Sequence, residues 1–129
     1  MKREAQFQVR FSHWLKAVYL KNNHGGLFEL KQCKLSLPFD AVAVHQLDAL
    51  VCAKLGKFYY KIPDDSVGQK PVDCVGLSCV DAYIVIYYSH ERFFCLVDVL
   101  VFVAEEKDSD RRSLTAARAR EISEIVVEC

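Results

Sequence analysis

Within the first twenty residues, apolar side chains recur with the spacing of an amphipathic helix. One helical face carries the apolar residues Phe7, Phe11, Trp14, Leu15 and Val18. The stretch KNNHGG then ends the periodic pattern with residues that favour turns. The pattern therefore predicts a helix over residues 4–20, packed through its aromatic face against the rest of the chain.

A short strand and a second helix are predicted next. In GLFELKQC, residues 26–33, alternation directs Phe28 and Leu30 to a core and places Glu29 and Lys31 together on the opposite face. An LPFD turn follows, and Asp40 is expected to cap a helix that runs to about Leu55. The apolar face of that helix is expected to comprise Val44, Leu47, Leu50 and Val51, with Gln46 at its border.

The second half of the chain reads mainly as strands, because β-branched and aromatic residues gather in short runs. The predicted strands are KFYYKI (57–62), VDCVGLS (72–78), AYIVIYY (82–88) and RFFCLVDVLVFV (92–103). Residues 63–71 and 105–113 read as a polar and a charged loop, and residues 113–127 as a closing helix with Ser113 or Thr115 near its cap. This order predicts a single α/β domain over residues 1–129, with a mixed sheet flanked by helices.

Composition narrows the class of protein. A length of 129 residues suits one core, and a hydrophobic fraction of 52% excludes a disordered chain. The apolar run at residues 93–104 is shorter than the roughly 20 residues of a membrane span. The first residues show no apolar signal region, so an intracellular, cytoplasmic protein is expected. Four cysteines lie among apolar residues and are expected to be reduced core thiols: Cys52, Cys74, Cys79 and Cys95.

Charge is divided unevenly between the two halves. Residues 1–70 hold eleven Lys/Arg and six Asp/Glu, whereas residues 71–129 hold six and eleven, so the formal net charge of zero conceals a basic and an acidic half. A basic half is able to supply a phosphate-binding face. The alternative explanation of this charge distribution is an ordinary surface whose charged residues are unevenly distributed.

Glu29 and Lys31 indicate chemistry on phosphodiesters. Their hydrolysis requires a divalent metal held by carboxylates and a positive charge that stabilises the developing charge on the phosphate. Glu29 supplies one carboxylate and Lys31 the positive charge. Asp73, just inside another apolar strand, is the candidate second carboxylate, because a buried aspartate is costly without a partner or a metal.

The segment FELKQCKLSLPFDAVAVHQLDAL and the later stretch YYKIPDDSVGQKPVDCVGL together resemble the PD-(D/E)XK nuclease superfamily. Within it, the similarity is greatest to Holliday junction resolvases of bacterial, archaeal and viral kinds. The resemblance implies a restriction-endonuclease-like fold with Mg²⁺, for which Mn²⁺ substitutes, held by Glu29 and Asp73. It also implies Lys31 as the catalytic lysine, Gln46 near the metal or its water, and Glu4 as the glutamate of the first helix.

The chain departs from this pattern in the order of its strands. The family usually places the aspartate strand before the ExK strand, whereas here no acidic residue lies in KNNHGGLF and Asp73 comes later. Asp73 is therefore interpreted as a displaced metal ligand. Asp64 and Asp65 are its competitors, although aspartates in a loop are common for turn chemistry alone.

The function implied by the resemblance is metal-dependent endonucleolytic cleavage of DNA, with a four-way junction as the expected substrate. The expected location is a nucleoid or a viral replication site. Candidate phosphate contacts are Arg10, Lys16, Lys34, Lys61 and Lys70. A symmetric junction is best cut by two identical sites, so a homodimer is expected, with residues 93–103 or the first helix as its face.

Two alternatives stay open. One is a nuclease of the same chemistry that acts on another DNA substrate in restriction, repair or end processing. The other is a non-catalytic nucleic-acid-binding module, in which Glu29 and Lys31 form an ordinary ion pair on a strand and Gln46 is an ordinary helix residue.

Overall fold

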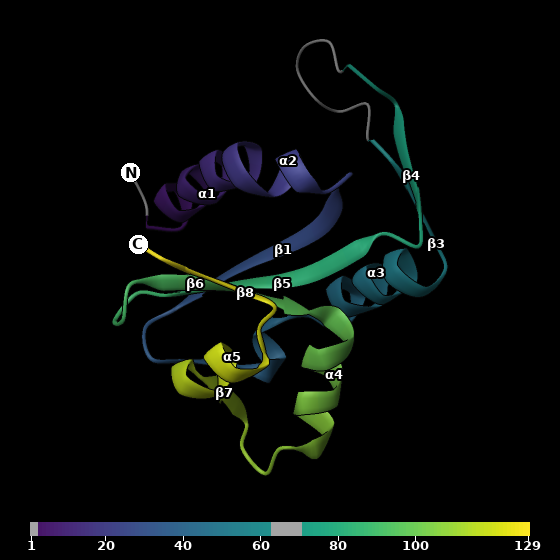
Figure 1. The fold of residues 1–129 in the computed structure, drawn as a ribbon. Coiled ribbons are helices and arrows are strands. Elements are labelled where there is room, and N and C mark those ends of the chain that lie inside the picture. Colours follow the sequence, from purple (N-terminus) through teal and green to yellow (C-terminus); the bar gives the residue numbers. More distant parts are fainter. Residues whose placement is uncertain (1–2, 63–70) are drawn as a thin grey trace.

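Four strands form a mixed sheet at the centre of the computed structural model, which describes residues 3–62 and 71–129, with side chains from residue 5 onwards (Figure 1). The strands follow the order β1 (Gly26–Cys33), β5 (Asp81–Tyr88), β6 (Phe93–Asp98) and β8 (Ile125–Glu128). β1 is parallel to β5, and the other neighbours are antiparallel. The predicted α/β class with a mixed sheet flanked by helices is confirmed.

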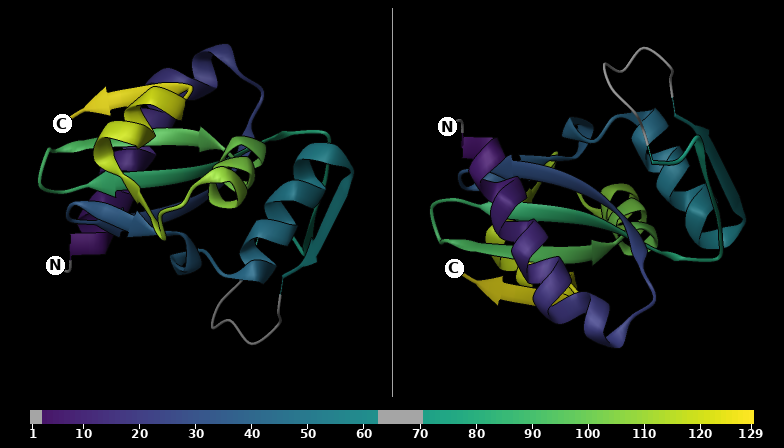
Figure 2. Two further views of the ribbon diagram at one scale, coloured as in Figure 1. Left: turned by 90° about the horizontal axis from the view of Figure 1, so that it is seen from below. Right: turned by 90° about the horizontal axis from the view of Figure 1, so that it is seen from above.

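Both faces of the sheet are buried, because apolar residues occupy consecutive positions of the central strands. On β5, Ile84 and Ile86 face one core, and Tyr83 and Val85 face the other. The first core is covered by α3 (Val44–Leu55), α4 (Val99–Asp108) and α5 (Ala116–Ile122), and the second by the N-terminal helix (Figure 2). β1 is an edge strand and keeps one side of its backbone unpaired within this sheet.

The N-terminal helix forms as predicted but contains an irregular turn. It consists of α1 (Arg3–Trp14), a π-helical segment (Leu15–Tyr19) and α2 (Leu20–Asn22). Phe7 and Phe11 are buried as expected, whereas Val18 is 48% exposed and Tyr19 is buried in its place. The wider π turn explains this correction, because it rotates the following residues relative to the apolar face of an α-helix.

The second helix is shorter than expected and is capped differently. β2 (Ser36–Pro38) leads into a 3₁₀ turn (Phe39–Ala41), so Asp40 lies in that turn, and α3 begins only at Val44 after Ala43. The prediction that Asp40 caps α3 is therefore wrong. Val44, expected on the apolar face, is 75% exposed, whereas Leu47, Leu50 and Val51 lie in or against the core as expected.

A separate hairpin follows α3. β3 (Lys57–Lys61) and β4 (Cys74–Ser78) pair with each other and form their own two-stranded sheet. The base of the hairpin is attached to the end of α3, since the Cys79 and Val80 amides donate to the carbonyls of Gly56 and Ala53. Its other end extends away from the four-stranded sheet (Figure 1).

The long apolar run at residues 92–103 is only half strand, contrary to the prediction. β6 ends at Asp98, whose carboxylate accepts from the Leu100 amide at 2.9 Å and caps α4. A helix N-cap of this type ends the strand even though the sequence stays apolar. The predicted charged loop is consequently shortened, because α4 continues to Asp108.

The predicted closing helix over 113–127 is also divided. Residues 113–115 form β7, which pairs with β2, and α5 then begins with Thr115 as its cap, as expected. Residues 125–128 form β8 at the edge of the sheet instead of helix. Pairing with β6 overrides the helical pattern, because it buries the apolar side chains of Ile125 and Val127 against the N-terminal helix layer.

All six cysteines are free, but only some of them lie in the core. Cys95 is buried, whereas Cys52, Cys74 and Cys79 are exposed, so the expectation of core thiols is wrong for these three. They lie on the outer side of α3 and on the hairpin, which the sheet does not cover. In the described part of the chain, no helix has both the length and the apolarity to cross a membrane.

Candidate functional site

Glu29, Lys31 and Gln46 meet on the face of β1 that is turned towards α3. Alternation along β1 places Glu29 and Lys31 between Leu27 and Cys33, which pack on the same core. The Lys31 Nζ atom lies 3.5 Å from Glu29 Oε1, and Gln46 Nε2 donates to the same oxygen at 2.9 Å. The structure therefore brings together three of the residues that the sequence singled out.

The local structure of α3 explains why Gln46 reaches Glu29. Ala43, the residue before the helix, has no side-chain oxygen to cap the first turn. Instead, the Ala43 amide donates to Gln46 Oε1 at 3.0 Å. This bond holds the Gln46 amide with its oxygen towards the backbone and its nitrogen towards Glu29.

The group is partly open to solvent. The side chains of Lys31 and Glu29 are 23% and 29% exposed. Both contacts to Glu29 use Oε1, and no described residue donates to Oε2. The site thus offers a carboxylate oxygen and a fixed ammonium side by side at the edge of the sheet.

Asp73 lies elsewhere in the fold. It immediately precedes β4, at the end of the hairpin that is remote from Gly56 and Cys79, and its carbonyl accepts from the Ile62 amide at 2.7 Å. Glu29 lies in the middle of β1, in the four-stranded sheet, opposite Ile84. The strand that carries Glu29 and the strand that follows Asp73 therefore belong to different sheets (Figure 1).

Several predicted residues lie outside the described part of the chain. Asp64, Asp65 and Lys70 belong to residues 63–70, and the side chain of Glu4 precedes the first described side chain. Across the described ranges, no group of three or more His, Cys, Asp or Glu side chains is arranged to hold a metal ion. Glu29 supplies one carboxylate, and the described residues do not complete a magnesium site around it.

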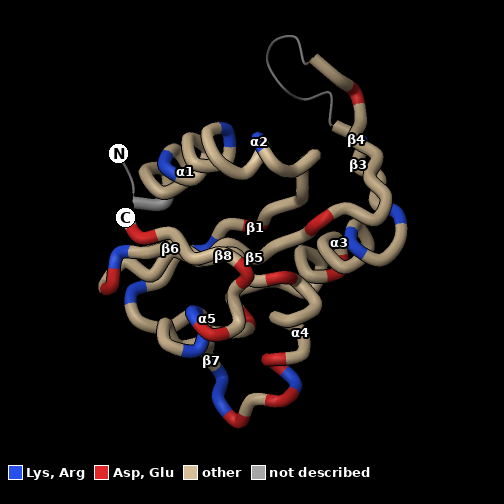
Figure 3. Tube along the Cα trace, viewed as in Figure 1, with Lys and Arg blue, Asp and Glu red and all other residues tan. Residues whose placement is uncertain are grey.

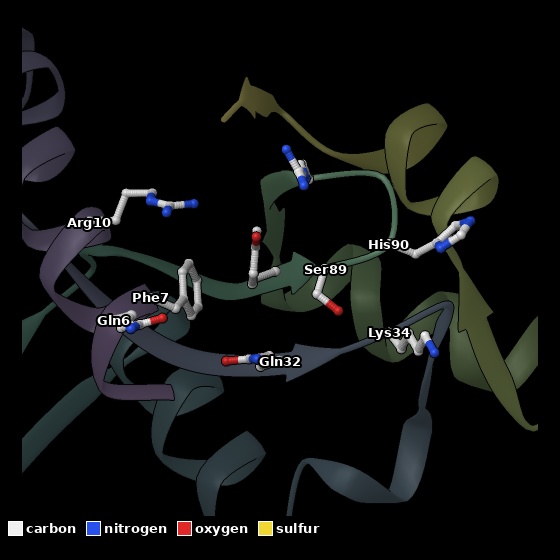
Figure 4. Close-up of a pocket in the computed structure, with 9 residues that line it drawn as sticks. Gln6, Phe7, Arg10, Gln32, Lys34, Ser89 and His90 are labelled. Atoms are coloured by element: carbon white, nitrogen blue, oxygen red, sulfur yellow. The ribbon is translucent and has the colours of Figure 1, made fainter. Parts of the chain in front are cut away.

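The predicted phosphate contacts separate into different regions. Lys61 is exposed at the outer end of β3, and Lys16 is exposed on the π-helical segment. Arg10 and Lys34, in contrast, line one pocket (Figure 4). Basic and acidic residues lie close together along the segment from α4 to β7, whereas the coloured segments of α1 and α2 are basic (Figure 3).

The pocket also contains residues that the sequence analysis missed. Its other polar lining includes Gln32 from β1, and Ser89, His90 and Arg92 from the turn between β5 and β6. Residues so far apart in the sequence share no local motif. Only the parallel pairing of β1 with β5 brings residue 34 beside residues 89–92, through the amide-to-carbonyl bonds Ser89–Cys33 and His90–Lys34.

A second acid–base pair is buried more deeply, at the junction of β6 and α4. The Lys54 ammonium contacts the Asp98 carboxylate, whose side chain is only 7% exposed. The hydrogen bond from Lys54 to Asp98 raises the pKa of the lysine above its ordinary value. Since Asp98 also caps α4, this pair joins α3 to the sheet and to α4 and has an architectural role.

Comparison with family models, with curated proteins and with solved structures finds no match to this chain.

Proposed function

We propose that the chain is a metal-dependent endonuclease that hydrolyses phosphodiester bonds in DNA, with a four-way junction as its preferred substrate. The observation that carries the proposal is the convergence of Lys31 and Gln46 on one oxygen of Glu29. The resemblance predicts that the glutamine of the following helix lies near the metal ligand Glu29. A strand that carries the ExK pattern by chance gives no reason to expect such a glutamine.

The roles of the three residues follow from their contacts. Lys31 is a positive charge beside Glu29, suited to hold an oxygen of the scissile phosphate or the attacking water. Gln46 orients Glu29 through a bond that is itself anchored to the backbone. A bound Mg²⁺, or Mn²⁺ in its place, would supply water activation and charge neutralisation.

The second carboxylate is the open element of the proposal. Asp73 is retained as the candidate, with Asp64 and Asp65 as alternatives, and the sheet is proposed to be a variant of the restriction-endonuclease-like core. Asp73 and Glu29 belong to different sheets, so the proposal depends on Glu29, Lys31 and Gln46 and not on Asp73.

A homodimer is proposed because a symmetric junction requires two equivalent cuts. Of the two dimer faces expected from the sequence, residues 93–103 offer little free surface, because residues 93–98 form β6, which is buried on both faces and paired on both edges, and Val101 in α4 is 39% exposed. The N-terminal helix carries exposed apolar residues, Val9 and Val18, each 48% exposed, and is the proposed face.

The test is nicking of an end-labelled four-way junction and of its matched linear duplex, with Mg²⁺ and with EDTA. Paired, metal-dependent nicks on the junction are expected for the wild type. Cutting of both substrates at equal rates would retain the nuclease and discard the junction preference. Loss of nicking in Asp73→Ala, with the fold intact, would assign the second carboxylate.

A non-catalytic DNA-binding module is the second candidate. The observation that favours it is the ion pair of Glu29 with Lys31, in which each charge already has a partner without a bound ligand. DNA binding by the folded wild type without nicking in Mg²⁺ or Mn²⁺ would select this candidate.

A further inference from the structure

A basic pocket lies on the face of the sheet opposite Glu29 and Lys31. Arg10 projects from α1 across the pocket from Lys34 and His90, and Gln32 lies on β1 between them (Figure 4). The cavity measures about 380 Å³. This volume is near the lower end of the roughly 300–1,000 Å³ typical of small-ligand sites.

The charge of the pocket is one-sided. Arg10, Lys34 and Arg92 contribute positive charge, and none of the described residues that line it is a carboxylate. Cys129 and Tyr87 raise the pKa of the Arg10 guanidinium above its ordinary value, so Arg10 stays charged. A group of cations with no carboxylate among the residues that line the pocket favours an anion, and arginine in particular favours phosphate.

The floor of the pocket contains an unsatisfied polar atom. Gln32 Oε1 is buried and accepts no hydrogen bond from the described residues. A buried acceptor without a donor costs about 1–3 kcal/mol. Because Oε1 is shielded from solvent, Gln32 faces the pocket with the rest of its side chain, whose amide N–H groups are able to donate to a ligand oxygen.

The pocket and the Glu29 site share one strand. Gln32 and Lys31 are neighbours on β1 and therefore point to opposite faces. Because β1 is the edge strand of the sheet, its open side gives one DNA strand access to both faces. The pocket is thus placed to hold the backbone of a strand whose other part lies at Glu29.

We propose that this pocket is a nucleotide-binding subsite for the DNA strand, in which Arg10, Lys34 and Arg92 hold a backbone phosphate and the Gln32 amide donates to an oxygen of the same nucleotide. This proposal rests on the proposed action on DNA, but it requires binding only and no cleavage.

The experiment measures binding of a labelled four-way junction and of a linear duplex in EDTA, over a range of salt concentrations. Arg10→Ala and Arg92→Asn remove the charges, and asparagine suits the positive φ of 58° at residue 92. Each is expected to weaken binding about tenfold and to lower the magnitude of the salt slope by about one. Gln32→Met, of similar size, is expected to weaken binding without changing the slope, because glutamine carries no charge.

Arg111→Ala is the matched control, since Arg111 is exposed on the loop between α4 and β7 and is not among the residues that line this pocket. Thermal unfolding verifies that each variant is folded. Wild-type affinity and salt slope in both arginine variants would overturn the proposal, even if the protein nicks DNA. An unchanged affinity in Gln32→Met would remove Gln32 from the ligand contacts. Equal competition by a free nucleoside monophosphate and by a DNA strand of equal nucleotide concentration would reassign the pocket to free nucleotides.

Discussion

Replacing Glu29 with glutamine separates a catalytic carboxylate from a structural ion pair. The variant keeps the shape of the side chain and an oxygen that accepts from Gln46, and it removes only the negative charge. The lost ion pair with Lys31 is partly exposed, at 23% and 29%, and such pairs contribute about 0–1 kcal/mol. The free energy of unfolding should therefore fall by no more than about 1 kcal/mol.

The effect on nicking should be far larger. If Glu29 holds the metal, loss of its charge removes several kcal/mol of transition-state stabilisation. About 4 kcal/mol corresponds to a rate reduction on the order of 10³. Glu29→Gln is thus expected to be folded and nearly inactive.

The assay pairs single-turnover nicking of a four-way junction in Mg²⁺ with urea denaturation of the same preparations. Glu106→Gln is the control, because it makes the same chemical change at an exposed position of α4. Nicking by Glu29→Gln within tenfold of the wild type would refute the assigned role. A loss of nicking that merely parallels a loss of folded protein would refute it equally.

Three further predictions concern stability. Phe102→Ala should lower the free energy of unfolding by about 3–5 kcal/mol, because Phe102 on α4 is fully buried in the core. A loss under about 1 kcal/mol in urea denaturation would contradict this packing. Asp98→Ala should cost about 1–3 kcal/mol, since the α4 cap and the partner of Lys54 are both lost, and an unchanged midpoint would argue against the cap. Lys54→Met should be less stable than the wild type at neutral pH. Because the folded-state pKa of Lys54 lies above its ordinary value of 10.5, the pair stabilises fully below that pH. The stability gap should close as the pH rises through the raised pKa, and a gap that widens there would be inconsistent with the pair.

The two-residue period of the strands was readable from the sequence because it is a local property. Alternation alone placed Glu29 and Lys31 on one face of residues 26–33, and the structure confirms this strand. For the apolar run after residue 92, the periodicity did not decide between strand and helix. A buried strand and a buried helix are both apolar all round, and only the contact of Asp98 with the Leu100 amide separates β6 from α4.

The candidate site was predictable in part for the same reason. Gln46 was found as a motif residue, but its bond to Glu29 depends on α3 packing across β1. Arg10 and Lys34 were chosen for their charge and proximity, whereas Arg92 and His90 gave no local signal. The pairing of β1 with β5, between segments about fifty residues apart, brings Lys34 to His90 and Arg92, and the packing of α1 on the sheet adds Arg10.

The sequence by itself determined the α/β class, the buried aromatic face of the first helix, and the shared face of Glu29 and Lys31, because each follows from local periodicity. The tertiary structure decided the partners: Gln46 on Glu29, Lys54 on Asp98, and the basic pocket at the edge of the sheet. It also placed Asp73 on a separate hairpin. These outcomes depend on which strands pair and which helices cover them, and such long-range contacts follow from packing of the whole chain.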